Sequence, residues 1–69
     1  MTTNARQLDW NAESARAAEM TNAQLWGAIR DILATLPNSD ALDREDDGNR
    51  GGYYRDQASV YRAEIASRH

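Results

Sequence analysis

The chain has 69 residues with eleven acidic and eight basic side chains, no cysteine and one histidine, His69. Its length allows one domain, and the missing cysteine excludes disulfides and thiolate metal sites. The formal net charge of -3 argues against a cationic face for duplex nucleic acid. A core of this size rarely supplies more than about 3–5 kcal/mol unaided. We therefore expect a homo-oligomer, or a chain completed by a protein partner.

The composition also bears on where the protein acts. All eight basic residues are arginine, and phenylalanine is absent, a bias typical of GC-rich bacterial and phage genes. No apolar run approaches the roughly 18 residues of a membrane span, and no signal-peptide pattern is visible. We expect no membrane contact and a cytoplasmic location, which would be the host cytoplasm if the gene is phage-encoded.

After a frayed stretch over 1–3, the sequence predicts an N-terminal helix over about 4–19. Asn4 and Gln7 form a weak capping pattern, and the following segment is rich in helix formers. Trp10 lies off the thin alanine stripe of this helix. It is expected to anchor the core against a later helix, because tryptophan is buried on average, and an exposed partner contact is the alternative.

The clearest helix signal covers about 21–36. Thr21 and Gln24 form a capping box, which favours a chain break at Met20–Thr21 over one continuous helix from about Asn4 to Leu36. Pro37 is expected to end the helix, because the residue before a proline is pushed out of the helical region. The apolar residues follow helical spacing and predict one buried stripe of Leu25, Trp26, Ile29, Ile32, Leu33 and Leu36.

Two features of this helix leave alternatives open. Gly27 costs roughly 1 kcal/mol against alanine in a helix interior, and it indicates either a tolerated cost or a close helix crossing. Trp26 and Arg30 stand four residues apart, so they can stack as a cation–π pair or contact a protein partner.

An acidic and glycine-rich connection is expected over 38–52. Ser39 or Asp40 can cap one or two helical turns there, and Gly48 can end them. The acidic residues indicate a solvent-exposed charged link. The alternative is that they mimic nucleic-acid phosphates and bind a basic groove on a partner protein. A calcium loop fails because Tyr54 stands where a bidentate glutamate is needed. The candidate partner-binding residues of this link are Asp43, Glu45, Asp46 and Asp47.

The end of the connection carries a possible anion site. Two glycines at a helix start can turn backbone N–H groups toward a phosphate, flanking arginines can bind it, and tyrosines can stack on a base. The alternative is a flexible hinge at which the tyrosines begin a core face. The candidate ligand-binding residues are Arg50, Gly51, Gly52, Tyr53, Tyr54 and Arg55.

A last helix is predicted over about 53–68, with one stripe formed by Tyr54, Ala58, Tyr61 and Ile65. It fits as the antiparallel neighbour of the helix over 21–36. Buried tyrosine hydroxyls need hydrogen-bond partners, and the acidic link is a candidate source.

These observations predict an all-α fold of three helices, with a helical hairpin and self-association into a bundle. We expect no enzyme, metal or cofactor, because the sequence offers no cysteine nucleophile and its carboxylates cluster on a polar link. The favoured function is a non-catalytic protein-interaction module, for instance a phage-type protein that binds or inhibits a host protein. The alternatives are an oligomeric binder of a nucleotide or other phosphate, and a structural assembly subunit.

Overall fold

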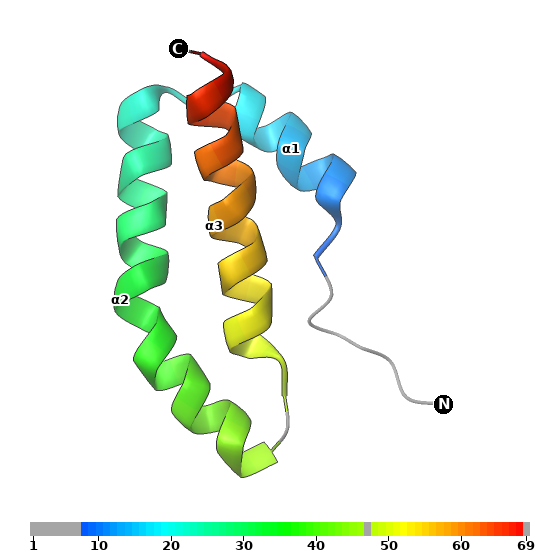
Figure 1. The fold of residues 1–69 in the computed structure, drawn as a ribbon, viewed down its shortest axis with the longest axis vertical. Coiled ribbons are helices and arrows are strands. Elements are labelled where there is room, and N and C mark those ends of the chain that lie inside the picture. The colour runs from blue at the N-terminus through cyan, green and yellow to red at the C-terminus, as the bar shows by residue number, and fades with distance from the viewer. Residues whose placement is uncertain (1–7, 47, 69) are drawn as a thin grey trace.

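The computed structural model describes residues 8–46 and 48–68, which form helices α1 (Trp10–Ala18), α2 (Asn22–Asp46) and α3 (Arg50–Ser67). The helices α2 and α3 make an antiparallel hairpin, and α1 packs on α3 (Figure 1). The Cα atoms extend over 39 × 27 × 13 Å, so the molecule is a flat layer with α3 between its neighbours. The predicted all-α fold with a helical hairpin is confirmed. Within the described ranges, no helix has the length and apolar character needed to cross a membrane.

The capping box separates α1 from α2. The Thr21 N–H donates to Gln24 Oε1 at 2.9 Å, and the Gln24 N–H donates to Thr21 Oγ1 at 3.1 Å. These bonds satisfy donors that a helix start leaves free, so the chain turns here. The alternative of one continuous helix is therefore wrong. At the other end of α1, Asp9 is the cap and its carboxylate accepts the Ala12 N–H at 3.1 Å. The predicted cap at Asn4 lies outside the described residues.

The predicted helix end at Pro37 is wrong, because α2 continues through this proline to Asp46. Pro37 is exposed, while Ser39 beyond it is buried and Asp40 bonds to α3. These tertiary contacts outweigh the local cost of a proline in a helix. The expected connection over 38–52 is thus mostly helical, and only 47–49 lie between α2 and α3.

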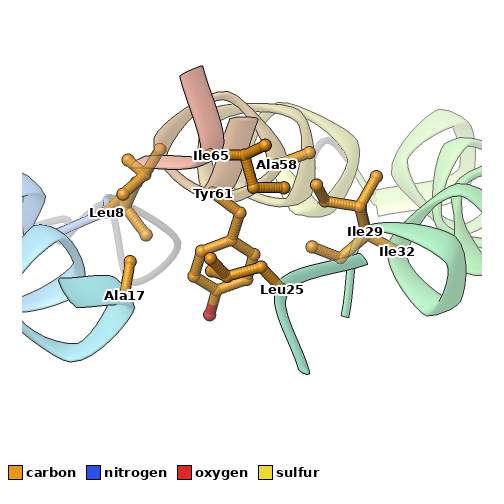
Figure 2. Close-up of a cluster of buried hydrophobic side chains, with 9 residues drawn as sticks. Leu8, Ala17, Leu25, Ile29, Ile32, Ala58, Tyr61 and Ile65 are labelled. Atoms are coloured by element: carbon orange, nitrogen blue, oxygen red, sulfur yellow. The ribbon is translucent and has the colours of Figure 1, made fainter. Parts of the chain in front are cut away.

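The core lies between the hairpin helices and against the buried side of α1, which contributes Ala17. Tyr61 and Leu25 are its largest fully buried side chains, and Figure 2 shows Tyr61 reaching down from α3 between Ala17 and Leu25. The buried hydrophobic residues are Leu8, Ala17, Leu25, Ile29, Ile32, Ala58, Val60, Tyr61 and Ile65.

Three large side chains that the sequence assigns to the core are exposed instead. Trp10 is 51% exposed, Trp26 54% and Leu33 47%. The apolar stripe of α2 is wider than one neighbouring helix covers, so α3 buries Leu25 and Ile29 and leaves one flank open. The close-crossing interpretation of Gly27 is also wrong, because a Cβ built there meets nothing within 4 Å.

Arg68 holds the corner where α1, α2 and α3 meet. Its guanidinium donates to the backbone carbonyls of Ala17 at 3.2 Å and Met20 at 2.8 Å, and to Asn22 Oδ1 at 2.7 Å. Its Nε donates to Glu64 Oε2 at 2.9 Å, which orients the side chain. The carbonyls at the end of α1 therefore find a partner from α3 rather than from solvent.

Candidate functional site

The predicted anion site at the start of α3 already holds a carboxylate of the same chain. Asp43 Oδ1 accepts the Arg50 N–H at 2.9 Å, and Asp43 Oδ2 accepts the Gly51 N–H at 2.8 Å. These are the free donors of a helix N-terminus, which favour a negative charge. Asp43 thus caps α3 from the neighbouring helix and takes the position that a phosphate would need.

Arg50 is bound by the same cluster. Its two terminal nitrogens donate to the two carboxylate oxygens of Asp46, each at 2.7 Å, and Nη1 also reaches Asp43 at 3.3 Å. The Arg50 hydrogen bonds lower the pKa of Asp46 to about 2. The Gly51 N–H, with help from Arg50, lowers the pKa of Asp43 below its usual value. The bidentate pair also raises the pKa of Arg50, so this guanidinium is already neutralised by carboxylates of the same chain.

Arg55 and Gly51 complete the contact between the hairpin ends. Arg55 donates to Asp40 at 2.8 and 3.3 Å, and this pairing raises the pKa of the guanidinium. A Cβ added at the buried Gly51 would overlap Asp40 Oδ1 and lie 2.8 Å from Arg55 Nη1. Glycine at this position therefore leaves room for the Asp40–Arg55 ion pair.

The two tyrosines of the candidate ligand site belong to the edge of the core. Tyr53 and Tyr54 are partly buried against the hydrophobic cluster, and their rings meet edge to face with centroids 5.8 Å apart. A Cβ added at the neighbouring Gly52 would overlap the Asn49 side chain. The tyrosines therefore lie at the edge of the core, as the alternative expects, but the hinge of that alternative is wrong, because Arg50 to Gly52 form the first turn of α3.

The acidic residues of the predicted partner site are divided by the fold. Asp43 and Asp46 are engaged with α3, whereas Glu45 is exposed. Asp47 lies outside the described residues. The structure therefore leaves a smaller free acidic surface here than the run DREDD indicates.

A buried polar cluster that the sequence did not predict links α1 to α3. Glu13 is only 7% exposed, and its Oε2 accepts the Tyr61 hydroxyl at 2.5 Å and the Gln57 amide at 3.3 Å. Arg16 donates to the Tyr61 hydroxyl at 3.3 Å. Burial, followed by the bond to Glu13, raises the pKa of Tyr61. The acidic link, the candidate source of a partner, therefore supplies none of the hydrogen bonds of the Tyr61 hydroxyl in the described residues.

The only sequence signal for this cluster was the rule that a buried tyrosine hydroxyl needs a partner. That rule does not identify Glu13, which is one of eleven acidic residues in the chain. Every buried side-chain polar atom in the described ranges has a partner, so the cluster is a satisfied contact that fixes α1 on α3. No group of three or more residues suited to hold a metal occurs in the same ranges.

Trp10 stands at the rim of an open groove between α1 and α3. The groove measures about 440 Å³, and apart from Trp10 and Glu64 its walls are small side chains. A void of this kind offers room for a large apolar side chain from another molecule. The lining residues are Trp10, Ser14, Ser59, Val60, Ala63, Glu64 and Ser67.

A second exposed surface, here called the Trp26 face, follows one flank of the hairpin. Positions 26, 30, 33, 37 and 44 of α2 share a stripe that lies about a quarter turn from the buried stripe. On α3, Arg62 lies at a similar angle from the buried stripe of that helix, and it is displaced in the same rotational sense along the chain. Because the two helices are antiparallel, both flanks open on the same side. The residues, all exposed, are Trp26, Arg30, Leu33, Pro37, Arg44 and Arg62.

The opposite flank of α3 faces α1. Gln57 on that flank bonds to Glu13, and Val60 and Glu64 line the groove with Trp10. The Trp26 face is therefore the side of the hairpin that α1 leaves uncovered. Trp26 and Arg30, predicted as partner-binding residues, lie together on it, whereas Trp10 belongs to the separate groove.

Comparison of the chain with protein-family models, with curated proteins and with solved structures finds no significant match.

Proposed function

We propose that the chain is a non-catalytic protein-interaction module that acts in the cytoplasm. The observation that carries this proposal is the exposure of Trp26 and Leu33 on one flank of a hairpin whose turn end is held by internal ion pairs. Large exposed apolar side chains that share a surface are typical of binding sites, and tryptophan and arginine dominate binding energy at interfaces.

The arrangement of polar groups supports the same proposal. The buried Glu13 carboxylate is bonded to Tyr61 and Gln57, and the carboxylates at the hairpin turn are bonded to arginine. A general acid or base needs access to a substrate, and a nucleophile needs an adjacent base. The described side chains supply contacts between helices instead, which is the requirement of a small scaffold that presents a surface.

A pull-down with matched variants tests this proposal. The wild type and the variants Trp26→Ser, Trp10→Ser and Asp31→Ser are immobilised, and bacterial lysate proteins are quantified on each. We expect one or more proteins that the wild type and Asp31→Ser retain and that a tryptophan variant loses. Equal retention on all four proteins would contradict the proposal, because no surface tryptophan would then carry binding. The composition favours a bacterial host of a phage as the source of the lysate.

Self-association is a second proposal, and the groove at Trp10 favours it. Small side chains at Ser59, Ala63 and Ser67 let another helix approach α3 closely, and Trp10 can cover it. A structural assembly subunit would use this surface. Sedimentation at rising concentration is expected to show a dimer or larger oligomer that Trp10→Ser weakens. A protein that stays monomeric at a concentration on the order of several hundred micromolar would contradict self-association.

The phosphate-binding alternative has weaker support. A nucleotide would have to displace Asp43 from the amides of Arg50 and Gly51, and Asp46 from the Arg50 guanidinium. Thermal melting against a nucleotide panel decides the question, because a ligand at a hundredfold excess over Kd adds about 2.7 kcal/mol. We expect no shift with the wild type.

A further inference from the structure

We propose that the Trp26 face docks an acidic amphipathic helix of a partner protein, which lies along the hairpin on the side opposite α1. This inference rests on the proposed function and names the chemistry of the partner. It starts from the shape of the molecule, since α1 supports only one side of the hairpin. A helix laid on the other side would pack against both α2 and α3.

The first supporting observation is the pattern of apolar exposure. Trp26 and Leu33 are 54% and 47% exposed, stand seven residues apart and are followed on the same stripe by Pro37. From Trp26 to Pro37 the stripe is about 16 Å long, which is three turns of helix. A partner helix of three to five turns with apolar residues at i, i+3 or i+4 and i+7 matches this length.

The second supporting observation is which arginines form ion pairs among the described residues. Arg16, Arg50, Arg55 and Arg68 each form an ion pair, whereas none is seen for the other three arginines of the described ranges. Those three are Arg30, Arg44 and Arg62, and all of them lie on the Trp26 face. An acidic chain of net charge -3 thus has a local cationic surface around its exposed tryptophan.

The acidic residues near this face do not neutralise it. Asp40, the acid closest to the stripe, is bound by Arg55 at 2.8 Å. Asp31 follows Arg30 directly, and one residue of helix turns it about 100° further around α2, away from the stripe of Trp26. Carboxylates on a partner would therefore find free guanidinium groups beside an apolar centre, the complementarity that sets register and specificity.

The same charges disfavour other occupants. A two-fold axis through the face would oppose the same patch on two copies, so that cationic surface would meet cationic surface. A nucleic acid or an anionic lipid surface is larger than the face and would meet the acidic remainder of the molecule. A single helix is narrow enough to stay within the cationic area.

Selection from a displayed library of helical peptides tests the inference directly. Peptides of about 18 residues, with randomised charged and apolar positions, are panned against the wild type, the double variant Arg30→Glu/Arg62→Glu, and Asp31→Arg as a control on the same helix. We expect the wild type and Asp31→Arg to enrich helices in which Asp or Glu flanks an apolar stripe. The double variant should bind them at least about tenfold more weakly and enrich Lys- or Arg-flanked helices instead.

Each opposing result overturns the inference. These results are no enriched helix, enrichment without acidic residues, binders that Trp26→Ser leaves unaffected, a dimer that Trp26→Ser dissociates, and Trp26-dependent binding of RNA or of phosphatidylserine vesicles. Circular dichroism of each variant confirms that α1, α2 and α3 are retained. A lysate partner lost with Trp10→Ser alone would overturn this inference and leave the proposed function standing, whereas equal retention on all variants would remove the proposed function itself.

Discussion

At the scale of single residues, the structure separates positions that hold the fold from positions left for contact. Gly27, Trp26 and Arg30 are neighbours on α2, yet none of them is needed for the packing of α2 on α3. Glu13 and Tyr61, by contrast, are buried and bonded to each other. Substitutions at the two kinds of position should therefore change the free energy of unfolding by different amounts and in different directions.

Gly27→Ala should stabilise the protein. The site lies inside α2, and an added Cβ meets nothing within 4 Å. Alanine loses less backbone entropy in a helix than glycine, so we expect a gain of about 0.5–1 kcal/mol in the free energy of unfolding. Urea unfolding followed by circular dichroism measures it. A loss of stability would show that α2 has a close neighbour at this position.

Tyr61→Phe should destabilise the protein by about 1–3 kcal/mol, because it leaves the buried Glu13 carboxylate without its closest donor. Tyr53→Phe is the matched control, since Tyr53 is only partly buried and no side-chain hydrogen bond is seen for its hydroxyl among the described residues. The same urea titration compares the two variants. Equal effects would contradict a special role for the Glu13 contact.

The carboxylates at the hairpin turn should make stability depend on acid pH. The folded-state pKa of Asp46 is about 2 and that of Asp43 is lowered, against about 3.9 for an unfolded aspartate. The stability that these two carboxylates contribute is therefore fully present above pH about 4, and it is lost as the pH falls through about 2. Asp46→Asn should lower stability at pH 7 and have little effect near pH 2, whereas Asp31→Asn should show no such difference. A pH-independent effect of Asp46→Asn would contradict this assignment.

At the scale of helices, the sequence predicts local signals better than tertiary ones. The Thr21–Gln24 capping box forms as the sequence indicates, because both partners lie within one turn. The stop at Pro37 fails, since contacts of Ser39 and Asp40 with distant residues carry α2 onward. Periodicity located the buried stripe of Leu25 and Ile29 but not its width, which depends on how many neighbours a helix has.

The candidate site follows the same division. Trp26 and Arg30 could be selected from their helical spacing, whereas Arg62 joins them only through the antiparallel packing of α3. The anion site at Arg50 and Gly51 has the expected residues, but the internal carboxylate of Asp43 fills it. No local pattern shows that Asp43 would face those amides.

Arg68→Ala should loosen α1 while leaving the hairpin folded. The Arg68 guanidinium donates hydrogen bonds to the carbonyls of Ala17 and Met20. Without it, these bonds between α3 and the end of α1 are lost. Native-state hydrogen exchange should show faster exchange in α1 and unchanged protection at the centre of α2 and α3. Arg62→Ala, which removes an exposed arginine with no ion pair among the described residues, should change neither. Uniform loss of protection would show that the corner is part of one cooperative unit.

At the scale of the whole molecule, a flat layer of three helices pairs much of its charge internally and exposes tryptophan on two surfaces. The turn between α2 and α3, the Glu13 cluster and the Arg68 corner use polar groups to hold the layer together. This arrangement compensates for the small apolar core expected of a chain of this length. What remains outside is an apolar and cationic flank and the groove at Trp10.

Photo-crosslinking in living cells tests this account most directly. A benzophenone amino acid replaces Leu33 on the Trp26 face or, as the control, Asp31 elsewhere on α2. We predict that the probe at position 33 forms a covalent product with a distinct partner protein, and that the probe at 31 forms little of it. Absence of a product at 33, or equal products at both positions, would contradict the claim that this surface exists to bind another protein.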